Sequence, residues 1–331
     1  MTDWINRHQL AVFVMTCLLI LFGGNELLSR WSHRLPYRRK LVEIAHTSNA
    51  NLLFVGNSLL DGYIDEAKLE SAAYQHGVIL RGLNAALGAT QPPEQELLFE
   101  DAIEHQPSLR TVVIGAYDLQ LTSDVPTRVD DLVGNRMVAI DSVFSMREVQ
   151  AVYRFDPGQR LAVELMRALP LVANRGSAWR DVEMLRRRMA QVGMPPVATN
   201  SMGRAADFDA LEAGSVTKFD EEVQQFLSSQ QRFNSPYRSI LQQAHDHGLR
   251  VVILIMPTSP FHRQTFYARP SWKEYLEALR KMAAEEQITL IDASGWMSDP
   301  HDFVDHLHLA PRAVGAFSTT LGATLATVPT S

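Results

Sequence analysis

The stretch Leu52-Leu53-Phe54-Val55-Gly56-Asn57-Ser58 decides the fold. Its first four residues form a short apolar run without polar alternation, which predicts a strand that is buried on both faces. A glycine, an amide and a serine follow at once, so Ser58 is expected in the loop at the carboxyl end of that strand. Open parallel sheets place their ligand sites at this edge. Ser58 is therefore the first candidate for chemistry.

Further apolar runs alternate with helical patterns along the chain. This alternation predicts an α/β fold, a three-layer α/β/α sandwich with about five parallel strands. Residues 119–235 show helix-like patterns without a strong strand, and this segment is too long for a loop, so we expect a helical insertion there. The other predicted strands are 78–80, 111–114, 251–255 and 288–291, and the predicted helices are 64–75, 94–104, 237–247, 272–286 and 312–325.

Composition excludes several classes of function. The 331 residues carry a formal net charge of −6, with no broad basic surface, so no nucleic-acid partner is expected. The single cysteine, Cys17, rules out an intramolecular disulfide and a cysteine-based zinc site.

An uncharged, largely apolar segment occupies residues 9–25. Its length is at the short end of the roughly 17–25 residues that span a bilayer as a helix, and no clear small-x-small cleavage site follows it. The segment predicts an uncleaved N-terminal transmembrane helix, with residues 1–46 as anchor and juxtamembrane segment and 47–331 as the main domain. The excess of Lys and Arg after the segment, taken alone, predicts that this domain stays in the cytoplasm.

A second group of chemically capable residues is Asp305-His306-Leu307-His308, just before the last predicted helix. A serine nucleophile needs a base to take its proton, and the base needs an acid to fix its tautomer. Asp305 and His308 are close enough in sequence for one loop to present both. By itself, the block also fits a helix-capping loop or, with His301 and Asp302, a metal site.

Together, the strand-Gly-x-Ser start and the Asp-x-x-His end resemble the SGNH (GDSL-like) hydrolase superfamily. The α/β-hydrolase elbow is absent, because Leu60 stands where its second glycine would be. The resemblance implies an SGNH/flavodoxin-like fold, with Ser58 as nucleophile, His308 as general base and Asp305 orienting His308. It implies no metal and no organic cofactor.

The family's two remaining blocks supply oxyanion donors, a glycine after the second strand and an asparagine after the third. The resemblance places the glycine at Gly88. The other block corresponds to Gly115-Ala116-Tyr117-Asp118, in which Tyr117 replaces the asparagine. Asn57, Asn84 or the Tyr117 hydroxyl are alternatives among which the sequence does not choose.

The sequence leaves open the roles of two polar residues that follow predicted strands. Asp118 is either a member of the site or a turn residue at the end of a strand. His262 follows the fourth predicted strand and is a candidate for substrate contact, although the neighbouring prolines also fit a structural turn.

The chain departs from the family pattern and has a predicted anchor and a large insertion. In these features it is similar to the membrane-anchored branch of the superfamily, which modifies bacterial envelope polymers. Relatives there include alginate O-acetyltransferases and proteins that add D-alanine to teichoic acid. The resemblance implies a serine-dependent acyl-ester hydrolase or O-acyl(acetyl)transferase acting on a cell-envelope polysaccharide or glycan. It also implies a membrane-bound acyl-transfer partner and a periplasmic location at the bacterial inner membrane. The alternative, which Tyr117 permits, is a catalytically inactive SGNH-fold protein that binds a glycan or serves as a scaffold.

Overall fold

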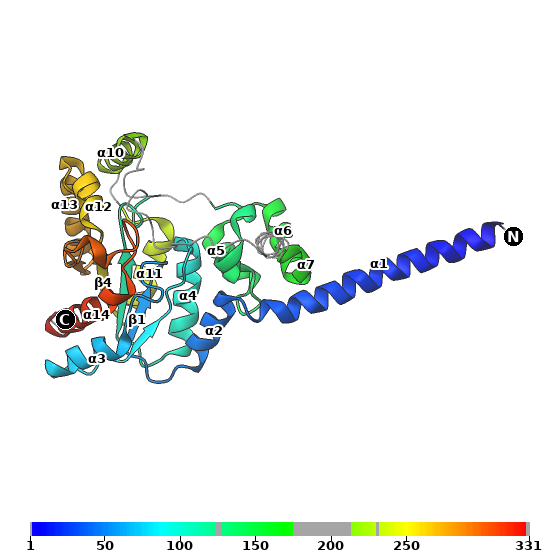
Figure 1. The fold of residues 1–331 in the computed structure, drawn as a ribbon, viewed down its shortest axis with the longest axis horizontal. Coiled ribbons are helices and arrows are strands. Elements are labelled where there is room, and N and C mark those ends of the chain that lie inside the picture. Colours follow the sequence, from blue (N-terminus) through cyan, green and yellow to red (C-terminus); the bar gives the residue numbers. More distant parts are fainter. Residues whose placement is uncertain (1, 124–126, 175–212, 230–231, 329–331) are drawn as a thin grey trace, which may run out of the picture. The chain divides into compact units, whose positions relative to one another are not determined.

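The computed structural model describes residues 2–123, 127–174, 213–229 and 232–328. Its strands form one five-stranded sheet in the order β2-β1-β3-β4-β5, and every neighbouring pair is parallel (Figure 1). This confirms the predicted α/β fold with five parallel strands. The strands are β1 (Leu52–Val55), β2 (Gly82–Asn84), β3 (Thr111–Ala116), β4 (Arg250–Ile255) and β5 (Thr289–Asp292).

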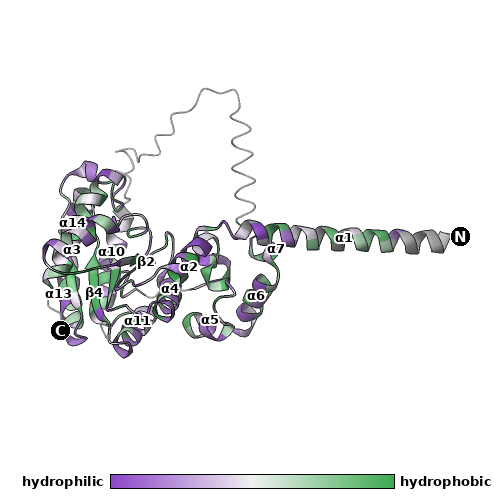
Figure 2. Cartoon of the chain, turned by 90° about the horizontal axis from the view of Figure 1, so that it is seen from below, coloured by the Kyte–Doolittle hydropathy of each residue, from purple (hydrophilic) through white to green (hydrophobic). Residues whose placement is uncertain are grey.

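Helices cover both faces of the sheet, which explains why its central strands are apolar throughout. Every residue of β1 and β3 is buried, and β4 lies in the hydrophobic range of the colour scale in Figure 2. One face carries α3 (Glu66–Gln75) and α14 (Pro311–Thr327), which share a core with the strands. Helices α4 (Pro92–His105) and α11 (Ser235–Asp246) pack together, and α13 (Pro270–Glu285) packs beside β5.

The local sequence explains where several of these helices begin. At the start of α3, the Asp65 side chain accepts a hydrogen bond from the N–H of Lys68, and at α11 the Asn234 side chain does the same for Tyr237. Helix α4 begins with Pro92, whose fixed φ suits a first helical position.

The second strand lies four residues later than predicted. Residues 78–80 are not a strand; β2 is Gly82–Asn84. The Asn51 side chain holds this segment outside the sheet, donating to the Ile79 carbonyl at 2.9 Å and accepting from the Arg81 N–H at 2.8 Å. Ile79 is 64% exposed. The apolar run predicted a strand wrongly, because backbone groups of this segment form hydrogen bonds with a side chain and not with a neighbouring strand.

The chain divides into two compact units, Met1–Lys40 with Thr127–Pro195, and Leu41–Pro126 with Pro196–Ser331. The predicted insertion, 119–235, contains helices and no strand among its described residues, while 124–126, 175–212 and 230–231 lie outside the described residues. Helix α10 (Ala213–Ser228) belongs to the second unit, as do α12 (Pro260–His262), η3 (Arg263–Tyr267) and η4 (Pro300–Asp302). Helix α2 (Pro36–His46) spans the boundary, and the first unit contains α1 (Thr2–Ser32), η1 (Val129–Asp131), η2 (Gly134–Ile140), α5 (Met146–Tyr153), α6 (Pro157–Ala168) and α7 (Pro170–Ala173).

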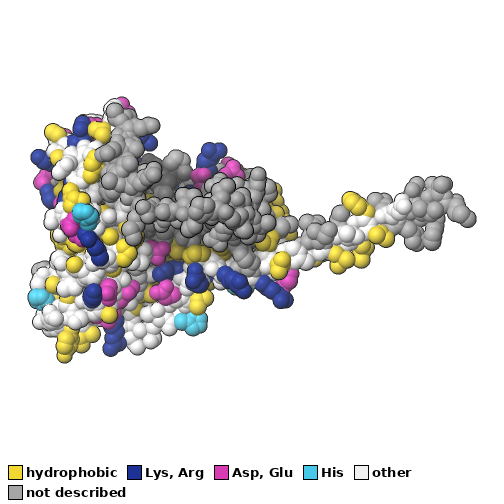
Figure 3. Space-filling model, viewed as in Figure 1, with side chains coloured by type: hydrophobic (Ala, Val, Ile, Leu, Met, Phe, Trp, Pro, Cys, Tyr) yellow, Lys and Arg dark blue, Asp and Glu magenta, His cyan; other side chains and the backbone are white. Residues whose placement is uncertain are grey.

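The N-terminal helix corrects one prediction. Helix α1 exposes apolar side chains such as Phe13, Leu19 and Phe22 (Figure 3). However, no helix in the described part of the chain is long and apolar enough to cross a membrane. The predicted transmembrane helix is therefore not found.

Candidate active site

The structure brings Ser58, His308 and Asp305 into hydrogen-bonding contact beyond the carboxyl ends of β1 and β5. Ser58 Oγ lies 2.9 Å from His308 Nε2, and His308 Nδ1 lies 2.8 Å from Asp305 Oδ2. Both distances are within the range that links a nucleophile, a base and the acid that orients the base. The two contacts predicted from distant sequence blocks are thus present in the structure.

A tight turn after β1 presents Ser58. The Asn57 side-chain oxygen accepts from the Leu59 N–H at 3.0 Å, and the Asn57 carbonyl accepts from the N–H groups of Leu60 and Asp61. Leu60 is buried and packs against Gly115, where a Cβ would lie 2.8 Å from Leu60 Cγ. Glycine on β3 therefore makes room for the side chain that anchors the turn.

The loop before α14 presents the base and its acid. Asp305 Oδ1 accepts from the N–H groups of Leu307 and His308 at 2.8 and 2.7 Å. Burial raises the pKa of Asp305, but these bonds and the His308 side chain outweigh it and lower that pKa to about 2. Asp305 is then ionised at neutral pH and only accepts hydrogen bonds. His308 Nδ1 carries the proton toward it, and in the neutral ring Nε2 faces Ser58 with its lone pair.

The structure does not present Gly88 and Asn84 as unoccupied oxyanion donors. The Gly88 N–H donates to Asp61 Oδ2 at 2.8 Å. The buried Asn84 amide donates to the Leu60 carbonyl at 2.9 Å, and its oxygen accepts from the Ala86 N–H at 3.0 Å. Asn84 thereby joins β2 to the Ser58 turn. Asp61 was missed from sequence, although it follows Ser58 by three positions.

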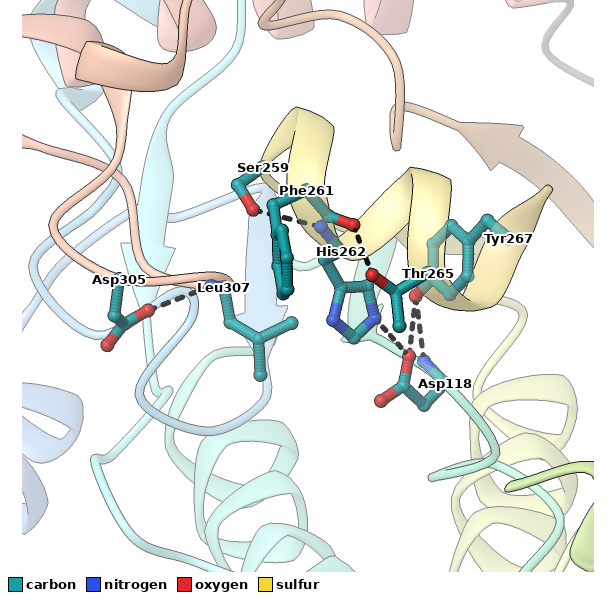
Figure 4. Close-up of polar contacts among 8 residues, drawn as sticks. All are labelled: Asp118, Ser259, Phe261, His262, Thr265, Tyr267, Asp305 and Leu307. Carbon is teal, nitrogen blue, oxygen red and sulfur yellow. Dashed lines mark hydrogen bonds and ion pairs between the residues drawn. The ribbon is translucent and has the colours of Figure 1, made fainter. Parts of the chain in front are cut away.

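A second acid–histidine contact lies beyond β3 and β4. Asp118 Oδ1 accepts from the Tyr267 hydroxyl at 2.8 Å and contacts His262 Nε2 at 2.9 Å (Figure 4). The Asp118 N–H also donates to the Tyr267 oxygen. The sequence singled out Asp118 and His262 separately, and the structure pairs them. The neighbouring Tyr117 is partly buried, and burial together with the Asp118 charge raises the pKa of its hydroxyl.

A hydrogen-bonded chain connects the Ser58 turn to the interior. The Asn57 amide donates to Gln120 Oε1 over a long 3.4 Å, Gln120 Nε2 donates to the Tyr237 oxygen at 2.9 Å, and the Tyr237 hydroxyl donates to Gln95 at 2.7 Å. Tyr237 and Gln95 are fully buried. Sequence reasoning missed Gln120, Tyr237 and Gln95, and the available signal was the position of Gln120 shortly after Asp118.

A cavity of about 350 Å³ borders this region, and its lining includes Tyr117, Asp118, Gln120 and His306. Burial and the neighbouring His262 lower the pKa of His306. The histidine-rich loop had also suggested a metal site. Among the described residues, however, no group of three or more His, Cys, Asp or Glu side chains is arranged to hold a metal ion.

No protein-family model and no curated protein matches the chain. Solved structures similar to it include a GDSL-like lipase from Bacteroides thetaiotaomicron VPI-5482, with 11% identity, 88% of this chain and 97% of that chain covered, and a TM-score of 0.38. A putative acylhydrolase from Bacteroides fragilis NCTC 9343 has 12% identity, 89% and 96% coverage and a TM-score of 0.38. A lipase/acylhydrolase from Enterococcus faecalis has 10% identity, 84% and 95% coverage and a TM-score of 0.38. At these values, the likeness carries no argument about activity.

Proposed function

We propose that this chain is an SGNH-type acyl-ester hydrolase or O-acyltransferase that works through an acyl ester of Ser58. The observation that carries the proposal is the continuous contact from Ser58 Oγ to His308 and from His308 to Asp305, at 2.9 and 2.8 Å. The three side chains come from two loops at the same edge of the sheet, where parallel α/β folds place their sites.

The reaction proceeds in two halves. Ser58 Oγ attacks the acyl carbonyl while His308 Nε2 takes the hydroxyl proton, and Asp305 stabilises the imidazolium through Nδ1. The alcohol oxygen of the ester takes the proton from His308 and departs. The acyl group then remains on Ser58 as an ester. Water or a second alcohol then attacks this ester and loses its proton to His308, which gives the proton to Ser58 Oγ as the acyl group leaves it. The incoming nucleophile decides between hydrolysis and transfer.

The oxyanion of each tetrahedral intermediate needs donors near Ser58. The backbone N–H of Ser58 and that of Gly88 serve this role in the proposal, and the Gly88 donor requires that the Asp61 carboxylate moves off it. Losing one such donor typically costs on the order of 10²–10³ in rate. The Asp61 contact therefore matters for the reaction rate.

The resemblance to envelope-modifying enzymes supports a more specific proposal. The acyl group, acetyl in the simplest case, moves to or from a hydroxyl of a cell-envelope polysaccharide or glycan. Location at the bacterial inner membrane on the periplasmic side, and a membrane-bound acyl-transfer partner, stay predictions. Cell fractionation and a reporter fused to the C-terminus test them.

Two observations favour a second candidate function. Asp61 occupies the Gly88 N–H, and Tyr117 stands where the family pattern has its asparagine donor. A protein that binds an acylated glycan without turning it over would tolerate both features. This candidate predicts ligand binding without acylation of Ser58.

The test uses the full-length protein, a fluorophosphonate probe and 4-nitrophenyl acetate. We expect labelling and hydrolysis in the wild type, and loss of both in Ser58→Ala and His308→Ala. The matched controls are Ser228→Ala and His301→Ala, because both side chains are exposed and lie outside the site. A folded wild-type protein that neither reacts with the probe nor hydrolyses the ester would overturn the proposal and favour the binding protein.

A further inference from the structure

The cavity of about 350 Å³ is connected by two of its lining residues to the loops that carry the proposed catalytic residues. Gln120, on its lining, accepts the amide hydrogen bond of Asn57, the residue before Ser58. His306, also on its lining, stands between Asp305 and His308 in the loop that carries the base. Ser58, Asp305 and His308 do not themselves line the cavity, but these two residues place it beside the loops that carry them. The volume is at the lower end of those typical of small-molecule sites.

The lining of the cavity combines apolar and polar groups, and the polar groups restrict the chemical class of its ligand. It combines the Asp118 carboxylate, the Gln91 and Gln120 amides and the hydroxyls of Ser123 and Ser215. A fatty acyl chain would remove these groups from water without offering partners, at a cost of roughly 1–3 kcal/mol for each buried group. A ligand with many hydroxyls offers both donors and acceptors to them.

An apolar wall faces part of the same space. Phe219 of α10 and Phe266 of η3 both line the cavity, and their ring centroids lie 5.0 Å apart. Binding sites for small molecules typically combine apolar and aromatic walls with a few fixed polar groups. A sugar ring has apolar C–H faces and a rim of hydroxyls, so it matches this combination.

The polar groups are held in place before any ligand arrives. Asp118 Oδ1 takes the contacts from Tyr267 and His262, and Figure 4 shows its second carboxylate oxygen turned away from both side chains. Gln120 is fixed by Tyr237 through its amide nitrogen. Such prior ordering lowers the entropy cost of binding.

The charges around the cavity argue against an anionic ligand. Asp118 and Glu222 both contribute carboxylates to the lining. Among the lining residues that the structure describes, Lys218 is the one Lys or Arg, and its ammonium lies 3.6 Å from Glu222. A ligand carboxylate would therefore meet fixed negative charge without an unpaired lysine or arginine nearby, which is unfavourable.

We infer that this cavity binds the alcohol part of the ester, and that this alcohol is an uncharged sugar residue. The inference rests on the proposed function, because it assigns a ligand to the space beside the acyl–Ser58 reaction. Asp118 and Gln120 select the hydroxyl pattern, and Phe219 contacts the ring face. The sugar ester is cleaved at Ser58, or the sugar hydroxyl receives the acyl group, with the proton transfers through His308 described above.

The first experiment compares two substrates on the full-length wild-type protein. A methyl hexopyranoside acetylated at O3 and the corresponding methyl hexuronoside differ only in the carboxylate at C6. We expect kcat/KM for the neutral sugar ester to exceed that for the uronate by about tenfold or more, which corresponds to about 1.4 kcal/mol. Equal rates, or a preference for the uronate, would overturn the assignment of an uncharged ligand.

The second experiment fills the cavity. Ser215→Trp adds a large side chain at the lining, and Ser228→Trp places the same side chain at an exposed position of the same helix, α10. We expect Ser215→Trp to lower the ratio of kcat/KM for the neutral sugar ester to that for 4-nitrophenyl acetate by about tenfold or more, mainly through KM. Ser228→Trp should keep the wild-type ratio.

The outcomes separate this inference from the proposed function. Labelling of Ser58 by the fluorophosphonate probe in each variant reports whether the reacting site is still formed. If 4-nitrophenyl acetate is hydrolysed in a Ser58-dependent manner but Ser215→Trp leaves the ratio unaltered, the sugar site is wrong and the esterase stands. If no ester is hydrolysed and Ser58 is not labelled, the proposed function itself fails.

Discussion

Ser58 Oγ lies 2.9 Å from His308 Nε2, although 250 positions separate the two residues in the sequence. The contact exists because β1 and β5 run parallel in one sheet, so the loops that follow them lie at the same edge. Neither loop contains both a nucleophile and its base. The fold itself therefore assembles the reacting pair.

Removal of the base tests this pair. His308→Gln should lower kcat for 4-nitrophenyl acetate by about 10³-fold or more, with a small change in KM, because proton transfer is needed only in the transition state. Steady-state kinetics measure the effect, with His301→Gln as the control because the His301 side chain is 81% exposed. An equal loss in both variants would indicate a general effect of histidine replacement.

The Asp305 contact predicts a dependence of stability on pH. The folded-state pKa of Asp305 is about 2, below its ordinary value of 3.8. A depressed pKa stabilises the fold above the ordinary value, and this contribution disappears as the pH falls through the folded-state value. Wild type should exceed Asp305→Asn in free energy of unfolding by a constant amount at pH 7 and 5, and by a decreasing amount from pH 4 toward 2. Urea unfolding at each pH measures this difference, and a gap that widens in acid would contradict the account.

The bond between Asp61 and Gly88 predicts a gain of activity. Asp61→Asn keeps a hydrogen-bond acceptor for the Gly88 N–H but removes the negative charge beside the position where the oxyanion develops. We expect kcat/KM for 4-nitrophenyl acetate to rise about tenfold, or about 1.4 kcal/mol. Asp246→Asn on α11 is a matched exposed control. A tenfold loss would mean that the carboxylate is needed for the reaction.

Close packing at Gly115 predicts a linked loss of stability and activity. A Cβ at this position would overlap the side chain of Leu60, which anchors the Ser58 turn. Gly115→Ala should destabilise the fold by about 1–3 kcal/mol and lower kcat. The double variant with Leu60→Ala should show less than the sum of the two single losses, because the overlap is gone. Gly295→Ala is the control, since nothing lies within 4 Å of its added Cβ, and equal stability of the two alanine variants would contradict this packing.

The sequence was sufficient for the features that depend on local pattern. Continuous apolar runs identified β1, β3, β4 and β5 to within two residues at each end, because buried parallel strands need such runs. The short edge strand β2 was misplaced, because an apolar run beside it is held by Asn51 and not by a neighbouring strand. Strand pairing is decided by tertiary contacts that a run of three residues does not reveal.

The site was partly predictable for the same reason. Ser58, Asp305 and His308 follow strands or precede a helix in recognisable blocks, so their types and positions indicated a shared site. The contacts of Gly88 with Asp61 and of Asp118 with His262 join loops that are distant in sequence. No spacing within either segment predicts such a pair, because the sheet order decides which loops meet.

The most direct test of the central claim is to trap the acyl enzyme. The full-length protein is mixed with excess 4-nitrophenyl acetate, quenched in acid within the first turnover, digested and analysed by mass spectrometry. The account predicts one acetyl group on the peptide that contains Ser58, absent from Ser58→Ala and strongly reduced in His308→Gln. Ester hydrolysis without an acetylated Ser58, or acetylation of another residue that is unaffected by these variants, would contradict it.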